Sequence, residues 1–264
     1  MKAYDFEYDG LRLSDMGFMI CTFGNGKSKA VSNGSHISFN TVSTLNGRKF
    51  ELTSFEYDNY LTATFYICKN PCVSDTQEIS LEESRKIMNW LNRGRFHKFK
   101  LLDLEYVNIY FEASFNVNKV EFDGKIYGFE LEMVTNRPFA IQEPVIVVFK
   151  NIVANSQRRI VSQSDEEGFI YPNMEITIED SGDFELYNVT EERRMRIANC
   201  EAGEVIKIDY PIITTSNPSH KIQNDFNWEF FRIVNSFKNK ENDIVFSLPC
   251  TVRIEYAPIV KVSV

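Results

Sequence analysis

Alternation of apolar and polar residues is the dominant pattern along the chain, and it predicts β-strands. In residues 107–117 every odd position is apolar, and the positions between are mostly polar. This pattern predicts one long strand with a buried face and a wetter face, because successive side chains point to opposite sides of a strand. The pair Asp123-Gly124 then leads into a second alternating run over residues 125–133. An Asp-Gly pair between two such runs predicts a tight hairpin.

A second hairpin is expected nearer the start of the chain. Two further runs of strand-like composition, residues 38–45 and 48–55, are separated by Asn46-Gly47. Asn-Gly readily adopts the positive φ angles that a two-residue hairpin turn requires, so the same architecture is predicted here.

Residues 81–93 are the one segment that predicts an α-helix. Ser80 and Glu83 form a capping box, in which each side chain satisfies a backbone N–H of the first turn. The helical stripe comprises Ser84, Ile87, Met88 and Leu91, with Trp90 at its flank. Gly94 is expected to close the helix in the left-handed conformation. The helix is expected to pack against a sheet; the alternative is an amphipathic helix that binds a partner.

The chain is long enough for two domains, and the alternation is interrupted between them. Pro138 and Pro144 fall close together, and neither residue suits a central strand. Short strands separated by turns then follow, without a further helix, as in antiparallel sandwiches and jelly rolls. The predicted fold is therefore mainly β, with two β-sandwich domains at residues 1–140 and 141–264. The first of these domains carries the helix.

Composition excludes several classes of protein. The net charge is −8, which argues against a broad surface for nucleic acid. The five cysteines are unevenly spaced, and only Cys68 and Cys72 lie close together, so neither a disulfide framework nor a zinc site is expected. The first residues, 1–10, lack the apolar run of a signal peptide, and no stretch is long and apolar enough to span a membrane. We therefore expect a protein made and folded in a cytoplasm.

One short motif resembles part of a nucleotide-binding loop. The sequence GNGKS at residues 24–28 contains the Gly-Lys-Ser end of such a loop. The full motif needs a further glycine where this chain has Cys21, and a strand rather than a helix is predicted to follow. A plain glycine-rich loop is therefore the better interpretation.

No pattern in the sequence selects a catalytic site. His36, His97 and His220 are the only histidines, and each is expected at the surface or at a strand end. None lies in a hydrolase or metalloprotease motif. The 37 acidic residues are so many that some pairs would fall at catalytic spacing by chance. We therefore expect no enzyme activity, and no catalytic residue, cofactor or metal site is assigned.

Residues 224–233, NDFNWEFFRI, mix aromatic and polar side chains and allow two interpretations. One is a platform on which a sugar ring stacks on Trp228. The other is a buried strand with Phe226, Trp228 and Phe230 on one face. The polar neighbours would then lie on the opposite face, whereas a sugar site needs them beside the ring. The pattern therefore favours a core strand.

The order of several segments resembles the distal tail proteins of long-tailed, siphovirus-type bacteriophages, over nearly the whole chain. The segments are FEYDGLRLSDMGFMI, NWL followed by FHKFKLLD, GFELEMVTNRPFA, RRMRIANCEAGEVIKID, DFNWEFFRIVN and NDIVFSLPCTVRIEYAPI. The resemblance implies an N-terminal β-sandwich that closes into a homo-hexameric ring and a galectin-like C-terminal domain. It further implies a place at the virion tail tip, where the ring joins the tail tube protein to a tail-tip, fibre or tail-associated lysin protein. DNA would pass the central channel without specific binding.

Two surface assignments follow from this resemblance. Tyr106, Asn108 and Tyr110, on the wetter face of the long predicted strand, are candidates for the contact between ring subunits. The alternative function is a carbohydrate-binding adhesion module that recognises host cell-wall saccharide through the C-terminal domain, with Trp228 as its contact. Galectins bind sugar through a His-Asn-Pro-Arg type cluster, whereas residues 217–220 have the order NPSH, without the arginine. The missing cluster weakens the alternative, because a shared fold does not transfer a function.

Overall fold

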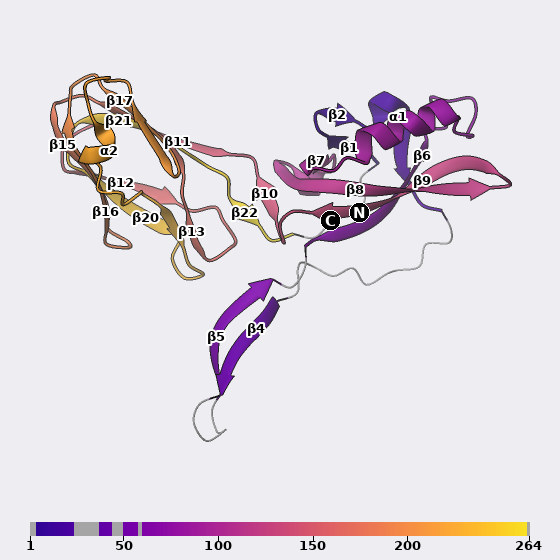
Figure 1. Ribbon diagram of the computed structural model, residues 1–264, viewed down its shortest axis with the longest axis horizontal. Helices are drawn as coiled ribbons and strands as arrows, with labels where there is room; N and C mark the ends of the chain where they lie inside the picture. The colour runs from indigo at the N-terminus through magenta and orange to yellow at the C-terminus, as the bar shows by residue number, and fades with distance from the viewer. Residues whose placement is uncertain (1–3, 24–36, 44–49, 58–59, 263–264) are drawn as a thin grey trace. The chain divides into compact units, whose positions relative to one another are not determined.

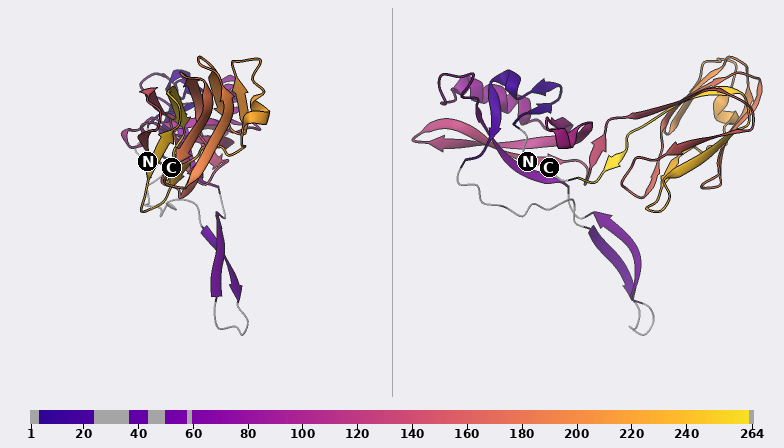
Figure 2. Two further views of the ribbon diagram at one scale, coloured as in Figure 1. Left: turned by 90° about the vertical axis from the view of Figure 1, so that its left-hand side faces the viewer. Right: turned by 180° about the vertical axis from the view of Figure 1, so that it is seen from behind.

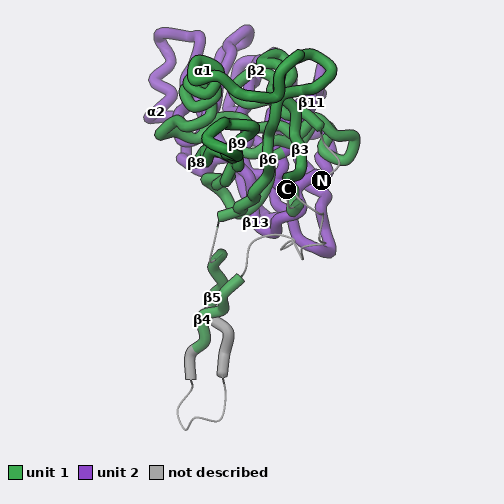
Figure 3. The backbone as a smooth tube through the Cα atoms, turned by 90° about the vertical axis from the view of Figure 1, so that its right-hand side faces the viewer, with its two compact units in different colours: residues 1–141, 260–264 green, residues 142–259 purple. Residues whose placement is uncertain are grey.

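The computed structural model describes residues 4–23, 37–43, 50–57 and 60–262. The chain forms two compact units, shown in Figure 3: residues 1–141 with 260–264, and residues 142–259. Antiparallel strands dominate both units, so the predicted mainly β fold class is confirmed. The last residues group with the first unit, whereas the sequence-based division placed them in the second domain.

The first unit is built on one large antiparallel sheet with the order β2-β1-β7-β8-β9-β6-β3 (Figure 1). Its strands are β1 (Phe6–Tyr8), β2 (Leu11–Arg12), β3 (Phe18–Cys21), β6 (Thr62–Lys69), β7 (His97–Leu101), β8 (Ile109–Phe122) and β9 (Lys125–Thr135). Two short strands, β10 (Ala140–Gln142) and β22 (Ile259–Val260), extend the sheet beside β8. Two 3-10 turns, η1 (Ser14–Met16) and η2 (Leu104–Tyr106), join its strands.

The predicted hairpin between the two longest strands is confirmed. Phe122 of β8 pairs with Lys125 of β9, and the two residues between them have φ angles of 50° at Asp123 and 72° at Gly124. Positive φ at both turn positions gives the twist that joins antiparallel strands. The first strand, however, begins at Ile109 rather than at residue 107.

The earlier hairpin is also present. Strands β4 (Ile37–Ser43) and β5 (Phe50–Tyr57) pair antiparallel, with Ser43 opposite Phe50. The turn residues Asn46 and Gly47 lie outside the described residues. The GNGKS segment and His36 also lie outside the described residues.

Helix α1 (Leu81–Leu91) begins with the predicted capping box. The Ser80 hydroxyl accepts a hydrogen bond from the Glu83 amide at 3.2 Å, and the Glu83 carboxylate accepts one from the Ser80 amide at 2.8 Å. The second Glu83 oxygen lies 2.9 Å from the ammonium group of Lys69 on β6, which ties the helix start to the sheet. The expected closure at Gly94 is wrong, because the helix ends at Leu91 and Gly94 has no positive φ.

Replacing Ser80 with alanine is expected to destabilise the first unit by about 1 kcal/mol, the usual cost of losing an N-cap. Urea denaturation measures this loss. Ser74→Ala is the matched control, because the Ser74 hydroxyl only donates to a carbonyl within an exposed loop. Equal stability of the two variants would show that the capping box contributes nothing.

Aromatic rings fill the space between α1 and the sheet. Trp90 stacks on Phe6 at a centroid distance of 5.6 Å, and its indole N–H donates to the Tyr8 carbonyl at 3.1 Å. Trp90 therefore belongs to the core, rather than to the flank of the helical stripe. Phe99 and Phe115 lie 5.3 Å apart in the same buried cluster. Such edge-to-face and stacked pairs add to the stabilisation from burial alone.

The second unit is a sandwich of two antiparallel sheets (Figure 2). One has the order β11-β21-β14-β17-β18 and the other β12-β20-β15-β16, with β13 and β19 forming a small separate pair. Its strands are β11 (Val145–Ile152), β12 (Ser156–Val161), β13 (Gly168–Ile170), β14 (Asn173–Ile178), β15 (Gly182–Asn188), β16 (Arg193–Cys200), β17 (Val205–Asp209), β18 (Ile212–Thr215), β19 (Ile233–Asn235), β20 (Glu241–Phe246) and β21 (Cys250–Tyr256). Alternate residues of both sheets point inward and form one apolar core, as the alternating sequence predicts.

The NDFNWEFFRI segment does not form the predicted core strand. It begins in a short helix, α2 (Ile222–Asp225), and then follows the edge of β16, where Phe226 pairs with Ile197. Phe226 and Phe230 are buried, but the Trp228 side chain is 55% exposed. The prediction that these three aromatics share a buried face is therefore wrong for Trp228.

The side chain of Asn227 explains this outcome. Its carbonyl oxygen accepts from the Arg196 amide at 3.1 Å, and its NH₂ group donates to the Arg194 carbonyl at 2.8 Å. Asn227 thus pairs with the edge of β16 through its side chain as well as through its backbone, whose amide donates to the Arg196 carbonyl at 3.1 Å. The next residue, Trp228, has a φ of 61°, which breaks the alternation of a strand and places its ring in solvent.

His220 is buried, contrary to the sequence-based expectation of a surface position. Its side chain is 2% exposed, and its Nδ1 lies 2.6 Å from a carboxylate oxygen of Glu204. Burial by itself raises the pKa of Glu204. Hydrogen bonds from Thr215, the Glu201 amide and His220 outweigh this effect and hold the pKa below its ordinary value of 4.5.

The Glu204 carboxylate is therefore expected to make the second unit sensitive to acid. A carboxyl with a lowered folded-state pKa contributes its full stabilisation above pH 4.5, and this is lost as the pH falls through the folded-state pKa. Glu204→Gln should flatten the dependence of the unfolding free energy on pH below pH 4.5. Denaturant titrations across the acid range measure this slope, and an unchanged slope in the variant would contradict the assignment.

Candidate assembly surface

The segment that joins β7 to β8, residues 102–109, forms a small apolar surface on the first unit. Its course is set by two polar residues. The Asp103 carboxylate caps η2 by accepting a hydrogen bond from the Glu105 amide at 3.2 Å. Asn108 then has a φ of 63°, in the left-handed region that Asn tolerates better than most residues, and turns the chain into β8.

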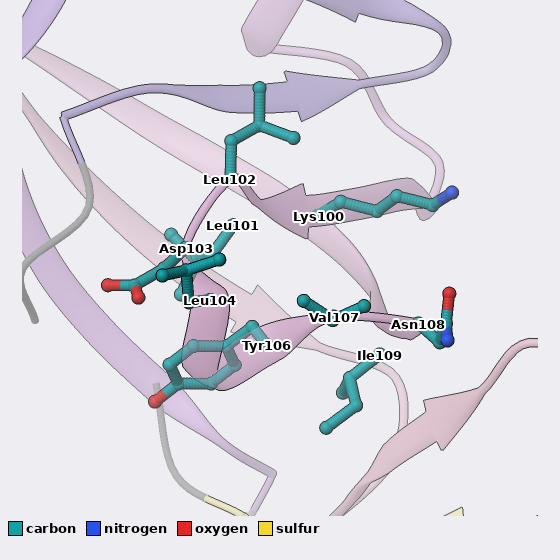
Figure 4. A pocket seen from close by; sticks show the side chains of 9 residues that line it. All are labelled: Lys100, Leu101, Leu102, Asp103, Leu104, Tyr106, Val107, Asn108 and Ile109. Atoms are coloured by element: carbon teal, nitrogen blue, oxygen red, sulfur yellow. The ribbon is translucent and has the colours of Figure 1, made fainter.

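The capped turn leaves apolar side chains in solvent. Leu104 is 91% exposed, and Val107 and Leu102 are also exposed. Together with their neighbours they border a depression of about 350 Å³, shown in Figure 4, whose lining also includes Tyr106 and Ile109. Clustered apolar side chains in solvent are typical of surfaces that bind a partner, because covering them removes apolar area from water. We call residues 102–109 the assembly segment.

The three residues predicted for the subunit contact do not share a strand face. Only Tyr110 lies in β8, while Tyr106 is in η2 and Asn108 is in the turn between them. Tyr106 and Asn108 nevertheless both border the depression in Figure 4. The Tyr110 ring is covered by the ammonium group of Lys98, 4.3 Å from its centroid. Their role in assembly stays a prediction.

Tyr106 links this surface to the core beneath it. Its ring packs against the buried cluster of the first unit. Burial raises the pKa of the Tyr106 hydroxyl, and the nearby carboxylates of Glu105 and Asp103 raise it further, so the ring stays neutral. A neutral phenol at the border of an apolar depression can contribute contact area and a hydrogen bond together.

Sequence reasoning missed the most exposed apolar residues of this segment. Leu102 and Leu104 receive no predicted element, and Val107 is predicted on the buried face of the long strand. The available signal was the sequence Leu-Leu-Asp-Leu at residues 101–104, which breaks the alternation and places an N-capping aspartate between leucines. Such a sequence predicts a capped turn with apolar side chains beside it.

Among the described residues, no group of three or more His, Cys, Asp or Glu side chains is arranged to hold a metal ion. Within the same ranges, the structure contains no helix with the length and apolar character needed to cross a membrane.

Trp228, the residue assigned to sugar binding, forms a second exposed feature, on the second unit. Its ring contacts Phe226 and Phe230 at centroid distances of 5.5 and 6.3 Å. The row continues from Phe230 to Tyr210 at 5.1 Å, and Tyr210 is stacked on Tyr171 at 3.9 Å. Because the Trp228 side chain is exposed, its predicted burial no longer argues against the hypothesis that it contacts a sugar.

Trp228→Ala is expected to change the unfolding free energy of the second unit by no more than about 0.5 kcal/mol, because the side chain is exposed. Phe230→Ala, which removes a buried neighbour in the same segment, is expected to cost about 3–5 kcal/mol. Denaturation followed by circular dichroism compares the two variants. A loss of several kcal/mol in Trp228→Ala would mean that this ring supports the core.

The chain matches models of two known protein domains. A family model described as "Phage tail protein N-terminal domain" matches residues 1–137, and one described as "Phage tail C-terminal domain" matches residues 139–256. The chain therefore belongs to this family of phage tail proteins, and it is a structural protein of the virion tail. No curated protein sequence matches it.

A solved structure shares the fold over almost the full length. It is the Dit protein of phage SPP1, whose title describes it as "a Paradigm of Hub Adsorption Apparatus in Gram-positive Infecting Phages". The two chains are 11% identical, with a TM-score of 0.64, over 97% of this chain and 99% of that chain. At this identity the likeness shows a common fold, and the chain is thus a phage tail protein with a distal-tail-protein fold.

Proposed function

We propose that this protein forms a homo-hexameric ring that joins the tail tube to the tail-tip or host-adsorption apparatus. The observation that carries the proposal is the full-length fold match to a protein described as a hub of an adsorption apparatus. The match to that protein covers both units of this chain. The proposed role therefore belongs to the chain as a whole rather than to one of its units. The first unit is the ring-forming domain, and the second is the outer, galectin-like domain.

The assembly segment supplies a physical basis for the ring. Subunits of a closed ring meet through two different complementary surfaces that repeat around the axis. Leu104 and Val107 offer one such surface, because their apolar side chains are already outside the core. Tyr106, Asn108 and Tyr110 lie within or next to it, and we propose that they contribute to the lateral contact.

The partners of the ring follow from its position. The tail tube protein would bind one side, and a tail-tip, fibre or tail-associated lysin protein the other. The net charge of −8 is compatible with a channel that DNA passes without specific binding, because like charges repel. In this proposal the protein is made in the bacterial host cytoplasm, acts at the virion tail tip, and has no catalytic role.

Electron microscopy of particles containing the chain tests this position. Antibody fragments against the second unit should label a single level at the distal end of the tail. Labelling at repeated levels along the tube would identify a tube component instead and would contradict the proposal.

A second candidate function is carbohydrate binding by the second unit. The observation that favours it is the exposure of Trp228, which the core-strand interpretation had excluded. Host recognition and ring formation are compatible, because they use different units of the chain. Binding of oligosaccharides to the isolated full-length protein tests this candidate independently of its assembly state.

A further inference from the structure

A polar depression lies at the end of the segment that carries Trp228. Its volume is about 260 Å³, and its lining side chains are polar or charged; they include Asn199, Glu201, Lys221 and Asp225. It is bordered by the end of β16 and by α2, both within the second unit. This combination of donors and acceptors suits a ligand that can form both kinds of hydrogen bond.

The observation that indicates a ligand in this depression is a buried, unpaired nitrogen of His220. The ring is 2% exposed, and its Nδ1 is engaged by the Glu204 carboxylate at 2.6 Å. Its Nε2 lies 3.4 Å from a carboxylate oxygen of Asp225 and, among the described residues, is buried without a hydrogen-bond partner. A buried nitrogen without a partner carries a desolvation cost that a bound hydroxyl group would offset.

The charges around the depression disfavour other classes of ligand. Glu201 and Asp225 line the depression together with Lys221, and Glu204 lies behind the His220 ring. The carboxylates outnumber the lysine of this lining, so an anionic ligand such as phosphate would meet repulsion. The polar lining gives an apolar ligand little to contact. A hydroxyl group, in contrast, can accept from or donate to Nε2, whichever protonation state the imidazole has.

Trp228 does not line the depression, but it is close to it along the chain. It follows Asp225 by three residues, a span of at most about 11 Å in an extended chain. The connecting residues run along β16, because Asp225 accepts from the Asn199 side chain at 3.2 Å and Asn227 pairs with Arg194 and Arg196. An exposed indole at this separation can stack on a neighbouring sugar ring of a short oligosaccharide, through its apolar C–H face.

We propose that this depression, with His220 and Asp225 reading hydroxyl groups and Trp228 as a stacking surface, is a binding site for an oligosaccharide. The proposal rests on the carbohydrate-binding candidate function and locates it on the second unit. His220 and Asp225 would hold one sugar ring by hydrogen bonds, and Trp228 would cover the next.

Screening of the full-length protein on an array of short oligosaccharides, made of hexoses, N-acetylhexosamines and deoxyhexoses, tests the proposal. The best ligand is then titrated by calorimetry against Asp225→Asn, Trp228→Ala and the control Phe237→Ala. Phe237 is an exposed aromatic of the same unit in a different turn. Thermal melting of each variant confirms that it is folded before titration.

The expected result is a loss of affinity of at least about tenfold in Asp225→Asn and in Trp228→Ala, and none in Phe237→Ala. Binding that persists unchanged in the two site variants would overturn this location, while the candidate function would stand. An array without a ligand would overturn both. Tighter binding of inorganic phosphate or arginine amide than of any oligosaccharide would also overturn the proposal.

Discussion

Replacing Phe99 with alanine is expected to lower the unfolding free energy of the first unit by about 3–5 kcal/mol, the usual cost of deleting a buried phenylalanine. The Phe99 ring is completely buried, and its centroid lies 5.3 Å from the ring centroid of Phe6 and 5.3 Å from that of Phe115. The cavity would lie where the sheet and α1 share their aromatic core, so neither layer could close it without moving the other.

The positions of the two tryptophans allow the loss of unfolding free energy to be measured in the first unit alone. Trp90 lies in the first core and Trp228 is exposed on the second unit, so a Trp228→Phe background leaves a fluorescence signal from Trp90 alone. Phe96→Ala is the matched control, because Phe96 is an exposed phenylalanine three residues away. Similar urea midpoints for the Phe99 and Phe96 variants would show that the aromatic cluster does not stabilise this unit.

Leu104→Asp is expected to prevent assembly while leaving the subunit folded. Leu104 is 91% exposed in the isolated chain, so the substitution costs the fold little. In the ring, the leucine would contribute about 1.5–3 kcal/mol of apolar burial to each contact, whereas an aspartate there would be a charge without a partner. Each contact should therefore weaken by at least about tenfold, and the loss is repeated around the ring.

Leu81→Asp is the control for the added charge. Leu81 is an exposed leucine of the same unit, at the first position of α1, where a carboxylate interacts favourably with the helix dipole. Under conditions in which the wild-type chain assembles, light scattering should give the wild-type mass for Leu81→Asp and a subunit mass for Leu104→Asp. Full assembly of the Leu104 variant would exclude the assembly segment from the subunit contact.

The features that the sequence predicts correctly depend on short-range chemistry. Asp123-Gly124 forms a hairpin turn because both residues accept positive φ, and Ser80 with Glu83 forms a capping box within one helical turn. Both outcomes depend on residues at most three positions apart. The strand alternation is similarly local, and it identifies the mainly β fold before any partner strand is known.

The errors arise where distant residues decide the conformation. Asn227 pairs with β16 through its side chain, and nothing within NDFNWEFFRI identifies that partner. His220 resembles a turn residue in NPSHK, yet Glu204 lies beside it in the fold and accepts its hydrogen bond. In both cases tertiary contacts override a local preference.

The candidate sites also combine features that the local sequence predicts with features that depend on the rest of the fold. Sequence reasoning selected Tyr106 and Asn108 for a polar strand face, whereas the structure places them on a capped turn beside Leu104. The composition of that segment was visible in the sequence, but its exposure depends on the length of β8 and on the φ of Asn108. The exposure of Trp228 likewise depends on the positive φ of that residue, which the sequence pattern does not predict.

The mass and symmetry of the assembled protein test the central claim most directly. Six copies of the 30.7-kDa chain give a particle of about 184 kDa. Native mass measurement, with two-dimensional averaging of electron micrographs and the neighbouring tail proteins present, should show a closed ring with six-fold symmetry. An open filament, or a particle that stays monomeric even with those neighbours present, would contradict the account.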